Sequence, residues 1–172
     1  MKSKSLGQKI ISDWFFTKGW KTFPFQEEVW NAFLDGKKGL LNAPTGSGKT
    51  FALWMPNLIK WINENPTDYK SKTNNGLKVL WVTPLRALTK DIQNALQLSL
   101  EDMNIPWEVG RRTGDVSQSI KQKQNKRMPE VLITTPESIH ILLAQKKYQR
   151  HFKNLDSIII DEWHELLGSK RG

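Results

Sequence analysis

Residues 43–50 read Ala-Pro-Thr-Gly-Ser-Gly-Lys-Thr, and this stretch decides the fold. Gly46 and Gly48 allow a backbone tight enough to turn its N–H groups inward on a phosphate. A lysine and a threonine follow in the register that phosphates and a divalent cation require, and a plain strand-to-helix turn has no need of them. The stretch therefore predicts a loop that binds ATP with Mg²⁺. Its nucleotide contacts are predicted to be Thr45, Gly46, Ser47, Gly48, Lys49 and Thr50, with Thr50 also a ligand of Mg²⁺.

The flanks of this loop have the required character, with one departure. The strict pattern opens with glycine, where this chain has Ala43, the smallest substitute. The short apolar run before it predicts a buried strand over 39–43. A helix is predicted from Lys49 to about residue 63, with its positive end at the phosphates. Pro56 is expected to kink or interrupt that helix.

An acidic pair, Asp161 and Glu162, follows three isoleucines near the other end of the sequence. Alone, such a pair is equally typical of a solvated helix start. Beside a phosphate loop it fits one chemistry: Asp161 holds Mg²⁺ through its water shell, and Glu162 polarises an attacking water.

The hydrophobic pattern alternates between strands and helices, which predicts an α/β fold with a mostly parallel sheet and helices on both faces. Residues 64–77 are polar and predict a surface loop. Thr-Pro steps end two of the strands, and the phosphate loop and the acidic pair also follow strands, so all are expected along one rim of the sheet. The predicted strands are 39–43, 78–83, 107–110, 131–134 and 157–161, and the predicted helices are 6–18, 26–34, 49–63, 85–101, 117–127 and 137–146.

The composition limits the kinds of binding partner and of cellular compartment that are expected. Lys and Arg number 26 against 17 acids, a formal net charge of +9, which favours a polyanionic partner, although solubility alone is a second explanation. The absence of cysteine excludes disulfides and cysteine metal sites. Neither a signal region nor a membrane-length apolar run is present, so a cytoplasmic protein is expected. The basic run 121–127 is interpreted as a solvated helix face, and Trp54, Trp61 and Trp81 as core residues.

Six short motifs then follow the order of a known family. They resemble motifs Q, I, Ia, Ib, Ic and II of the superfamily 2 helicases, from about residue 14 onward. The tail 161–172 resembles the large helicase-related (Lhr) family, most closely its ligase-associated DEXH branch. The stretches that carry the resemblance are Gln26, 43–50, 83–88, 113–115, 134–138 and 161–164.

The resemblance implies an N-terminal helical region, 1–36, with a Q-like motif, and a first RecA-like ATP-binding domain, 37–172. It implies that Gln26 reads the adenine edge, with Trp20 or Phe23 stacked on the base, although a buried turn glutamine is the other interpretation. His164 would couple the ATP site to nucleic acid or to a partner domain. Motif III and a second RecA-like domain with arginine fingers are missing, so the chain is expected to be a motor domain cut short.

The resemblance also implies residues that grip one nucleic-acid strand through its phosphates. Backbone N–H groups, hydroxyls and one arginine suit this task, although ordinary helix capping explains several of them singly. Arg111 and Arg112 either add charge there or form an exposed pair. The implied contacts are Pro84, Arg86, Thr113, Gly114, Asp115, Thr135, Pro136, Glu137 and Ser138.

The expected activity is that of an ATP-dependent 3′–5′ DNA helicase or translocase on single-stranded DNA, linked to DNA repair. Its expected partners are the second RecA-like domain and, by resemblance, a DNA ligase or nuclease. Three alternatives stay open: an RNA helicase, a translocase that moves on duplex without separating strands, and a nucleotide-binding module with no motor role. The isolated chain is expected to be weak or inactive.

Overall fold

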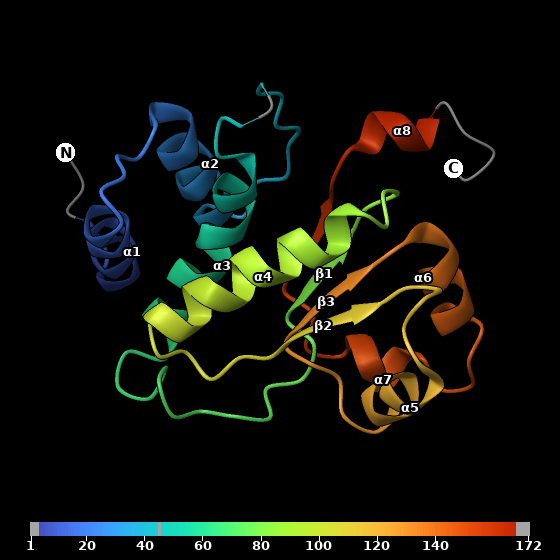
Figure 1. Ribbon diagram of the computed structural model, residues 1–172. Coiled ribbons are helices and arrows are strands. Elements are labelled where there is room, and N and C mark those ends of the chain that lie inside the picture. The colour runs from blue at the N-terminus through green and yellow to red at the C-terminus, as the bar shows by residue number, and fades with distance from the viewer. Residues whose placement is uncertain (1–3, 45, 168–172) are drawn as a thin grey trace. The chain divides into compact units, whose positions relative to one another are not determined.

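A computed structural model describes residues 4–44 and 46–167 (Figure 1). The chain divides into two compact units, with the boundary between Ser71 and Lys72. This division rests on compactness, and the functional domains expected over 1–36 and 37–172 stay a prediction. Thr45 of the predicted phosphate loop lies outside the described residues. Residues 168–172, which are part of the tail that resembles the Lhr family, also lie outside them.

The first unit consists of three helices, all of them expected from the sequence. They are α1 (Leu6–Thr17), α2 (Pro24–Leu34) and α3 (Lys49–Glu64). Contrary to the expected interruption, α3 continues through Pro56 as one element. Pro56 is itself buried in the apolar face of the helix, and the packing of that face against α1 and α2 outweighs the missing backbone hydrogen bond.

A cluster of aromatic rings joins the three helices. Phe51, in the first turn of α3, meets the rings of Trp14 at 5.3 Å and Phe15 at 6.0 Å between centroids, both edge to face. Trp30 of α2 packs against Phe15 at 5.8 Å and donates its indole N–H to the Phe51 carbonyl at 3.4 Å. Each aromatic pair adds about 0.5–1.5 kcal/mol beyond its buried area. The start of α3 is therefore fixed by packing.

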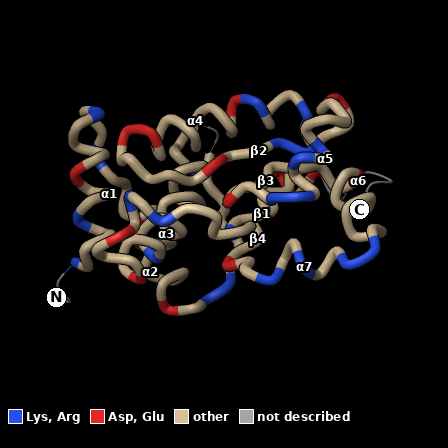
Figure 2. Tube along the Cα trace, turned by 90° about the horizontal axis from the view of Figure 1, so that it is seen from below, with Lys and Arg blue, Asp and Glu red and all other residues tan. Residues whose placement is uncertain are grey.

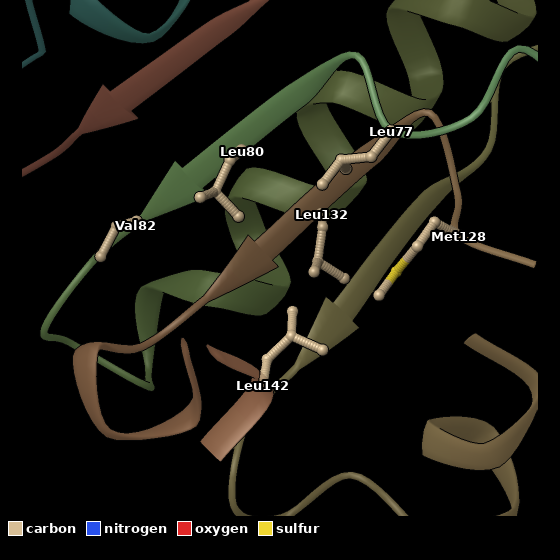
Figure 3. Packing of buried hydrophobic residues seen from close by; sticks show 6 residues of the cluster. All are labelled: Leu77, Leu80, Val82, Met128, Leu132 and Leu142. Atoms are coloured by element: carbon tan, nitrogen blue, oxygen red, sulfur yellow. The ribbon is translucent and has the colours of Figure 1, made fainter. Parts of the chain in front are cut away.

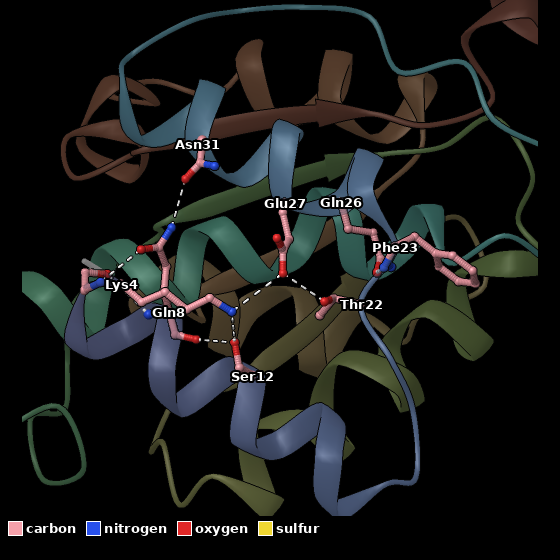
Figure 4. Close-up of polar contacts among 9 residues, drawn as sticks. Lys4, Gln8, Ser12, Thr22, Phe23, Gln26, Glu27 and Asn31 are labelled. Atoms are coloured by element: carbon pink, nitrogen blue, oxygen red, sulfur yellow. Dashed lines mark hydrogen bonds and ion pairs between the residues drawn. The ribbon is translucent and has the colours of Figure 1, made fainter. Parts of the chain in front are cut away.

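Polar contacts join α1 and α2 on the solvent side (Figure 4). The ammonium of Lys4 donates to the Ser12 hydroxyl at 3.1 Å and lies 3.7 Å from a carboxylate oxygen of Glu27, which also accepts from Thr22 at 2.9 Å. The Lys4 and Glu27 side chains are exposed, and such pairs contribute about 0–1 kcal/mol. The aromatic cluster therefore dominates the stability of this unit.

The strand expected over 39–43 does not form. Leu40 is 69% exposed and Gly39 is exposed, and two leucines between polar neighbours offer too little buried apolar surface to fix extended backbone. The sheet therefore holds the other four predicted strands, and the phosphate loop follows an irregular segment instead of a strand.

The second unit is built on a parallel sheet in the order β2-β3-β1-β4. The strand predicted over 78–83 is confirmed as β1. The strand β2 begins two residues later than predicted. The helices α7 and α8 were not predicted. The elements are β1 (Val79–Val82), α4 (Leu88–Asp102), β2 (Val109–Arg112), α5 (Gln118–Lys126), β3 (Val131–Thr134), α6 (Pro136–Leu143), α7 (Gln149–Phe152), β4 (Ser157–Ile160) and α8 (Trp163–Leu167).

Apolar side chains project from both faces of this sheet, because alternate residues of a strand point to opposite sides. One face packs against α6, where Leu80 and Leu132 meet Leu142 (Figure 3). The other face carries the fully buried Trp81 and Ile133, and α4 contacts β2 and β3. The tryptophans expected in the core, Trp54, Trp61 and Trp81, are buried. The predicted α/β class is confirmed. None of the helices in the described part of the chain combines the length and hydropathy of a membrane span.

Gly7 marks the closest approach of α1 to α3 and gives a test of this packing. A Cβ atom at Gly7 would lie 2.5 Å from the Ile59 carbonyl oxygen and 2.8 Å from its Cα, both backbone atoms that cannot swing aside. We expect Gly7→Ala to lower the free energy of unfolding by about 1–3 kcal/mol, measured by chemical denaturation. Gly39→Ala is the matched control, since a Cβ there meets nothing within 4 Å. Equal stability of the two variants would contradict the prediction.

Candidate functional site

The phosphate loop is shaped by two glycines in the left-handed region. Gly46 has φ +76° and Gly48 has φ +86°, values that cost a residue with a Cβ about 1–2 kcal/mol. The Ser47 hydroxyl donates to the Pro44 carbonyl at 2.6 Å, and the Lys49 ammonium donates to the Ala43 carbonyl at 2.8 Å. Both side chains thus close the turn, and Gly48 is the N-cap residue directly before α3.

Gln26 ties this loop to α2. Its side chain, on a residue only 1% exposed, donates to the Gly48 carbonyl at 3.1 Å and accepts from the Phe23 backbone at 2.9 Å (Figure 4). The second contact caps the first turn of α2. A Cβ at Gly48 would meet the Gln26 amide nitrogen at 2.7 Å, so the glycine also makes room for the glutamine. This arrangement matches the buried-turn interpretation of Gln26, and its contact with adenine stays a prediction.

The residues expected around a bound nucleotide have different surroundings. Lys49 and Thr50 are half-buried in the first turn of α3, where the backbone N–H groups have no partner within the helix. Phe23 is 52% exposed and stacks on Phe25 at 5.9 Å, and Trp20 is 47% exposed with an edge contact to Trp14. Both aromatic side chains therefore keep surface that a base can reach.

In the second unit, the four strands end in one row. The parallel register aligns Arg112, Thr134, Val82 and Ile160, the last residues of their strands. The next residue in each strand is Thr113, Thr135, Thr83 or Asp161. The predicted strand-end contacts of this unit therefore lie along one edge, which we call the carboxyl edge.

The three threonines of this row are fully buried, and their hydroxyls organise the turns that follow. The Thr113 hydroxyl donates to the Asp115 carboxylate, Thr135 bonds with the Ser138 hydroxyl at 3.2 Å, and Thr83 accepts from the Leu85 backbone at 3.4 Å. Pro136 and Glu137 lie in the first turn of α6. Hydrogen bonds within the turns thus account for the three threonine hydroxyls as the structure stands, and the nucleic-acid contacts of this row stay predictions.

Arg86 and the turn at Gly114 lie against each other. A Cβ on Gly114 would meet the guanidinium of Arg86 at 3.3 Å. The Thr113 hydroxyl and its own backbone N–H hold the pKa of Asp115 below its usual value, and the charges of Arg111 and Arg86 add to this. Asp115 is therefore ionised near neutral pH and offsets part of the positive charge at the carboxyl edge.

One residue absent from the predicted contacts, Thr89, takes part here. Thr89 donates to the Arg86 carbonyl at 2.7 Å and accepts from Arg111 at 3.2 Å, so it links β2 to the Arg86 turn. Arg112, by contrast, is 4% exposed, so the pair Arg111-Arg112 is not an exposed one. Adjacent residues of a strand point to opposite faces, a signal the sequence already contained.

The acidic pair follows β4 directly. The Asp161 backbone donates to the Val82 carbonyl at 2.8 Å, which extends the ladder by one residue. Glu162 has φ +49°, an unusual value for a residue with a side chain, and its N–H donates to the Asp161 carboxylate at 3.0 Å. The His164 ring lies 3.6 Å from the Glu162 carboxylate, which places the two predicted residues together.

A family comparison agrees with this fold and these motifs. The fold and the loop define the class of P-loop, RecA-like domains. A family model described as "DEAD/DEAH box helicase" matches residues 23–172, so the chain belongs to that family.

Individual relatives point to the Lhr proteins expected from the sequence. The chain is 37% identical to the ATP-dependent helicase Lhr-Core of Sulfolobus acidocaldarius, over 98% of this chain and 20% of the relative. It is 32% identical to the Lhr helicase/uracil glycosylase of Escherichia coli, over 93% of this chain and 11% of the relative. The chain thus spans a fifth or less of these relatives. The ligase-associated branch stays a prediction.

Solved structures confirm the RecA-like fold. A structure of Mycobacterium smegmatis helicase Lhr bound to ssDNA and AMP-PNP superposes with a TM-score of 0.76 at 28% identity, over 98% of this chain and 21% of that one. The DEAD-box helicase Mss116 bound to ssRNA and UDP-BeF gives 0.71 at 24% identity, over 97% and 32%, and shows the fold alone.

The contact between Gly48 and Gln26 can be isolated by two matched alanine variants. Gly48→Ala and Gly46→Ala both place a side chain at positive φ, but only the first meets Gln26, since a Cβ at Gly46 meets nothing within 4 Å. We expect Gly48→Ala to lose about 1–2 kcal/mol more unfolding free energy, the range for a disturbed buried hydrogen bond. Chemical denaturation of both variants measures this difference.

Adding Gln26→Ala to each variant supplies the control. The extra loss should shrink in the double variant, because the clash is then gone. If it stays unchanged, the clash with Gln26 is not its cause.

Proposed function

We propose that this chain is the ATP-binding first motor domain of an ATP-dependent helicase or translocase that moves on single-stranded nucleic acid. One observation carries the proposal: a single row of strand ends presents the Arg86 turn, the Thr113–Asp115 turn and the Asp161-Glu162 pair along the same edge. A motor must couple phosphate chemistry to a grip on a strand, and both sets of groups lie on this edge. Family membership and the preformed phosphate loop support the same conclusion.

The donor types present, a hydroxyl at Thr50 and a carboxylate at Asp161, suit a magnesium ion that takes most of its ligands from outside the protein. Among the described residues, no group of three His, Cys, Asp or Glu side chains gathers as a metal cage. Mg²⁺ prefers one or two protein oxygens together with phosphates and waters. The Thr50 hydroxyl and the Asp161 carboxylate would hold it, and the bound ion would neutralise charge on the phosphates.

Each side chain then has a task in ATP hydrolysis. Lys49 exchanges its bond with the Ala43 carbonyl for the β- and γ-phosphate oxygens, where its charge is better matched. Glu162 orients and polarises the attacking water, and His164, 3.6 Å away, carries changes there to the strand or to a partner domain. A second RecA-like domain supplies the arginine that stabilises the transferred phosphoryl group, a contribution of about 10³–10⁵ in rate.

Single-stranded DNA is the substrate we favour, with movement in the 3′–5′ direction and a role in DNA repair. The M. smegmatis relative was solved with ssDNA, which supports DNA. RNA is the second candidate, because a mouse relative that is 28% identical is described as a probable ATP-dependent RNA helicase. A DNA ligase or nuclease partner is a further part of the proposal and rests on resemblance, and the cytoplasmic location expected from the sequence is another part.

Mg-ATP binding tests the phosphate loop directly. We expect Lys49→Ala to weaken binding at least about tenfold in calorimetric titration, because a hydrogen bond to a charged group contributes about 1.5–3 kcal/mol. Lys9→Ala, which removes an exposed lysine from α1, is the control and should bind as the unchanged chain does. Equal affinities for all three proteins would overturn the nucleotide site.

Steady-state turnover separates the motor from a simple binder. The isolated 172 residues should bind Mg-ATP yet hydrolyse it slowly, with or without single-stranded DNA or RNA, because the arginine proposed to come from a second RecA-like domain would not be supplied. Strong stimulation by a strand that Lys49→Ala abolishes would contradict the need for a second domain.

The carboxyl edge is tested with labelled oligonucleotides. We expect Arg86→Gln to weaken binding of fluorescein-labelled (dT)₂₀ and to reduce the slope of log K against log salt by about 0.7, the value for one phosphate contact on a single strand. Fluorescence anisotropy over a range of salt concentrations measures both, with a matched RNA strand beside the DNA. An unchanged slope would place the strand elsewhere.

A further inference from the structure

A second positively charged surface lies away from the carboxyl edge, between α5 and α7. A shallow hollow there is lined by Gln122, Asn125, Lys126 and Arg150, and we call these four residues the α5–α7 surface. The guanidinium of Arg150 donates to the Asn125 carbonyl at 3.2 Å, which joins the two helices. Figure 1 shows them side by side, and Figure 2 shows Lys and Arg along both.

This surface is lined by residues of α5 and α7, while Arg112, which contacts it from below, is the last residue of β2. Lys126 is the last residue of α5, after which the chain enters β3 at its amino end, and α7 precedes the amino end of β4. The Arg86 and Gly114 turns follow the carboxyl ends of their strands. A ligand on the α5–α7 surface is therefore not held by the residues already assigned to the strand.

Positive charge is concentrated in this part of the sequence. Residues 118–153 contain eight Lys and Arg against two acids, an excess of six out of the formal +9 of the whole chain. Neither acid faces the hollow. Glu130 is 1% exposed and accepts from the backbones of Asn75 and Glu108, and Glu137 lies in the first turn of α6.

Beneath the surface lies a buried charge whose hydrogen bonds, within the described part of the chain, go to neutral groups. Arg112 is 4% exposed and donates to the Asn125 side chain at 3.0 Å and to the Lys121 carbonyl at 3.4 Å. Burial lowers its pKa, yet a guanidinium stays charged in proteins. Asn125 is thus held from below by Arg112 and from the side by Arg150, so two guanidinium groups share one asparagine.

The same two arginine charges act on the neighbouring histidine. His151 is 8% exposed, and its pKa is lowered first by burial and then by the charges of Arg150 and Arg112. A buried charge without an acidic partner is costly, and an external anion would relieve that cost. A solvated helix face alone does not call for a buried arginine behind it.

We propose that the α5–α7 surface binds the phosphate backbone of a nucleic acid, as a second contact apart from the carboxyl edge. The inference rests on the proposed function. Lys126 and Arg150 would contact phosphates, Arg112 would supply charge through Asn125, and Gln122 adds a neutral amide. These groups match phosphodiester oxygens and read no base, so the contact is independent of sequence.

The test measures salt-dependent binding of the whole 172-residue chain to two labelled probes, (dT)₂₀ and a blunt DNA hairpin. We expect the double variant Lys126→Gln/Arg150→Gln to reduce the slope of log K against log salt by about 1.4 on the single strand or about 1.8 on the duplex. The probe that shows the loss identifies the form of nucleic acid bound. Arg150→Lys, which keeps the charge, should retain most of the affinity.

The matched control, Lys9→Gln/Lys21→Gln, removes the same charge from exposed positions in the first unit. Equal losses of slope for both double variants, on both probes, would show that binding depends only on the net charge of the chain. That result would overturn the inference. Lys126→Gln alone changes an exposed side chain and keeps the test valid if the double variant folds poorly. Circular dichroism checks the folding of each variant. Arg86→Gln separates the two proposals. Weaker binding by Arg86→Gln, together with unchanged binding by Lys126→Gln/Arg150→Gln, would support the carboxyl edge and overturn the second contact.

Discussion

The parallel register of four short strands is the constraint on which the second unit depends. Arg112, Thr134, Val82 and Ile160 share one row, and each turn proposed to take part in function in this unit begins at the following residue. A slip of one residue in any strand would send its side chains to the other face and remove its turn from the edge. The buried core on both faces opposes such a slip, so packing far from the edge fixes the geometry at the edge.

Three of these turns use the same local device, a buried threonine whose hydroxyl bonds within the turn. Thr83, Thr113 and Thr135 all occupy it, each with a different partner. The hydroxyl satisfies local backbone or side-chain groups, and the outward-facing atoms of each turn stay available to solvent. The fold thus prepares a rigid edge before any ligand arrives.

Sequence patterns were most informative where burial and local chemistry agreed. The four strands of the sheet and most of the helices α1 to α6 follow from the alternation of apolar and polar segments, α5 was expected as a polar helix, and the phosphate loop follows from Gly-x-Gly-Lys-Thr. The strand over 39–43 was wrong because two leucines give too little burial to fix extended backbone. The short α7 and α8 were missed, since four or five residues carry no detectable period.

Side-chain placement was harder to foresee than the elements. The roles of Thr89 and Arg112 depend on which face of β2 each arginine takes, and the predicted strand, 107–110, ended before both arginines, so alternation was not applied to them. Gln26 illustrates a second limit: the motif gave its position, but only the fold shows that both ends of its amide already bond to Phe23 and Gly48.

Glu162 brings a final consequence of its backbone. Its φ of +49° suits glycine or asparagine, and a residue with a longer side chain there costs about 1–2 kcal/mol of local stability. The fold tolerates this cost because the Asp161 carboxylate and the first turn of α8 hold the peptide on either side. The residue that best suits the backbone at this position therefore differs from the residue proposed for the reaction, so selection for thermal robustness alone would remove the carboxylate.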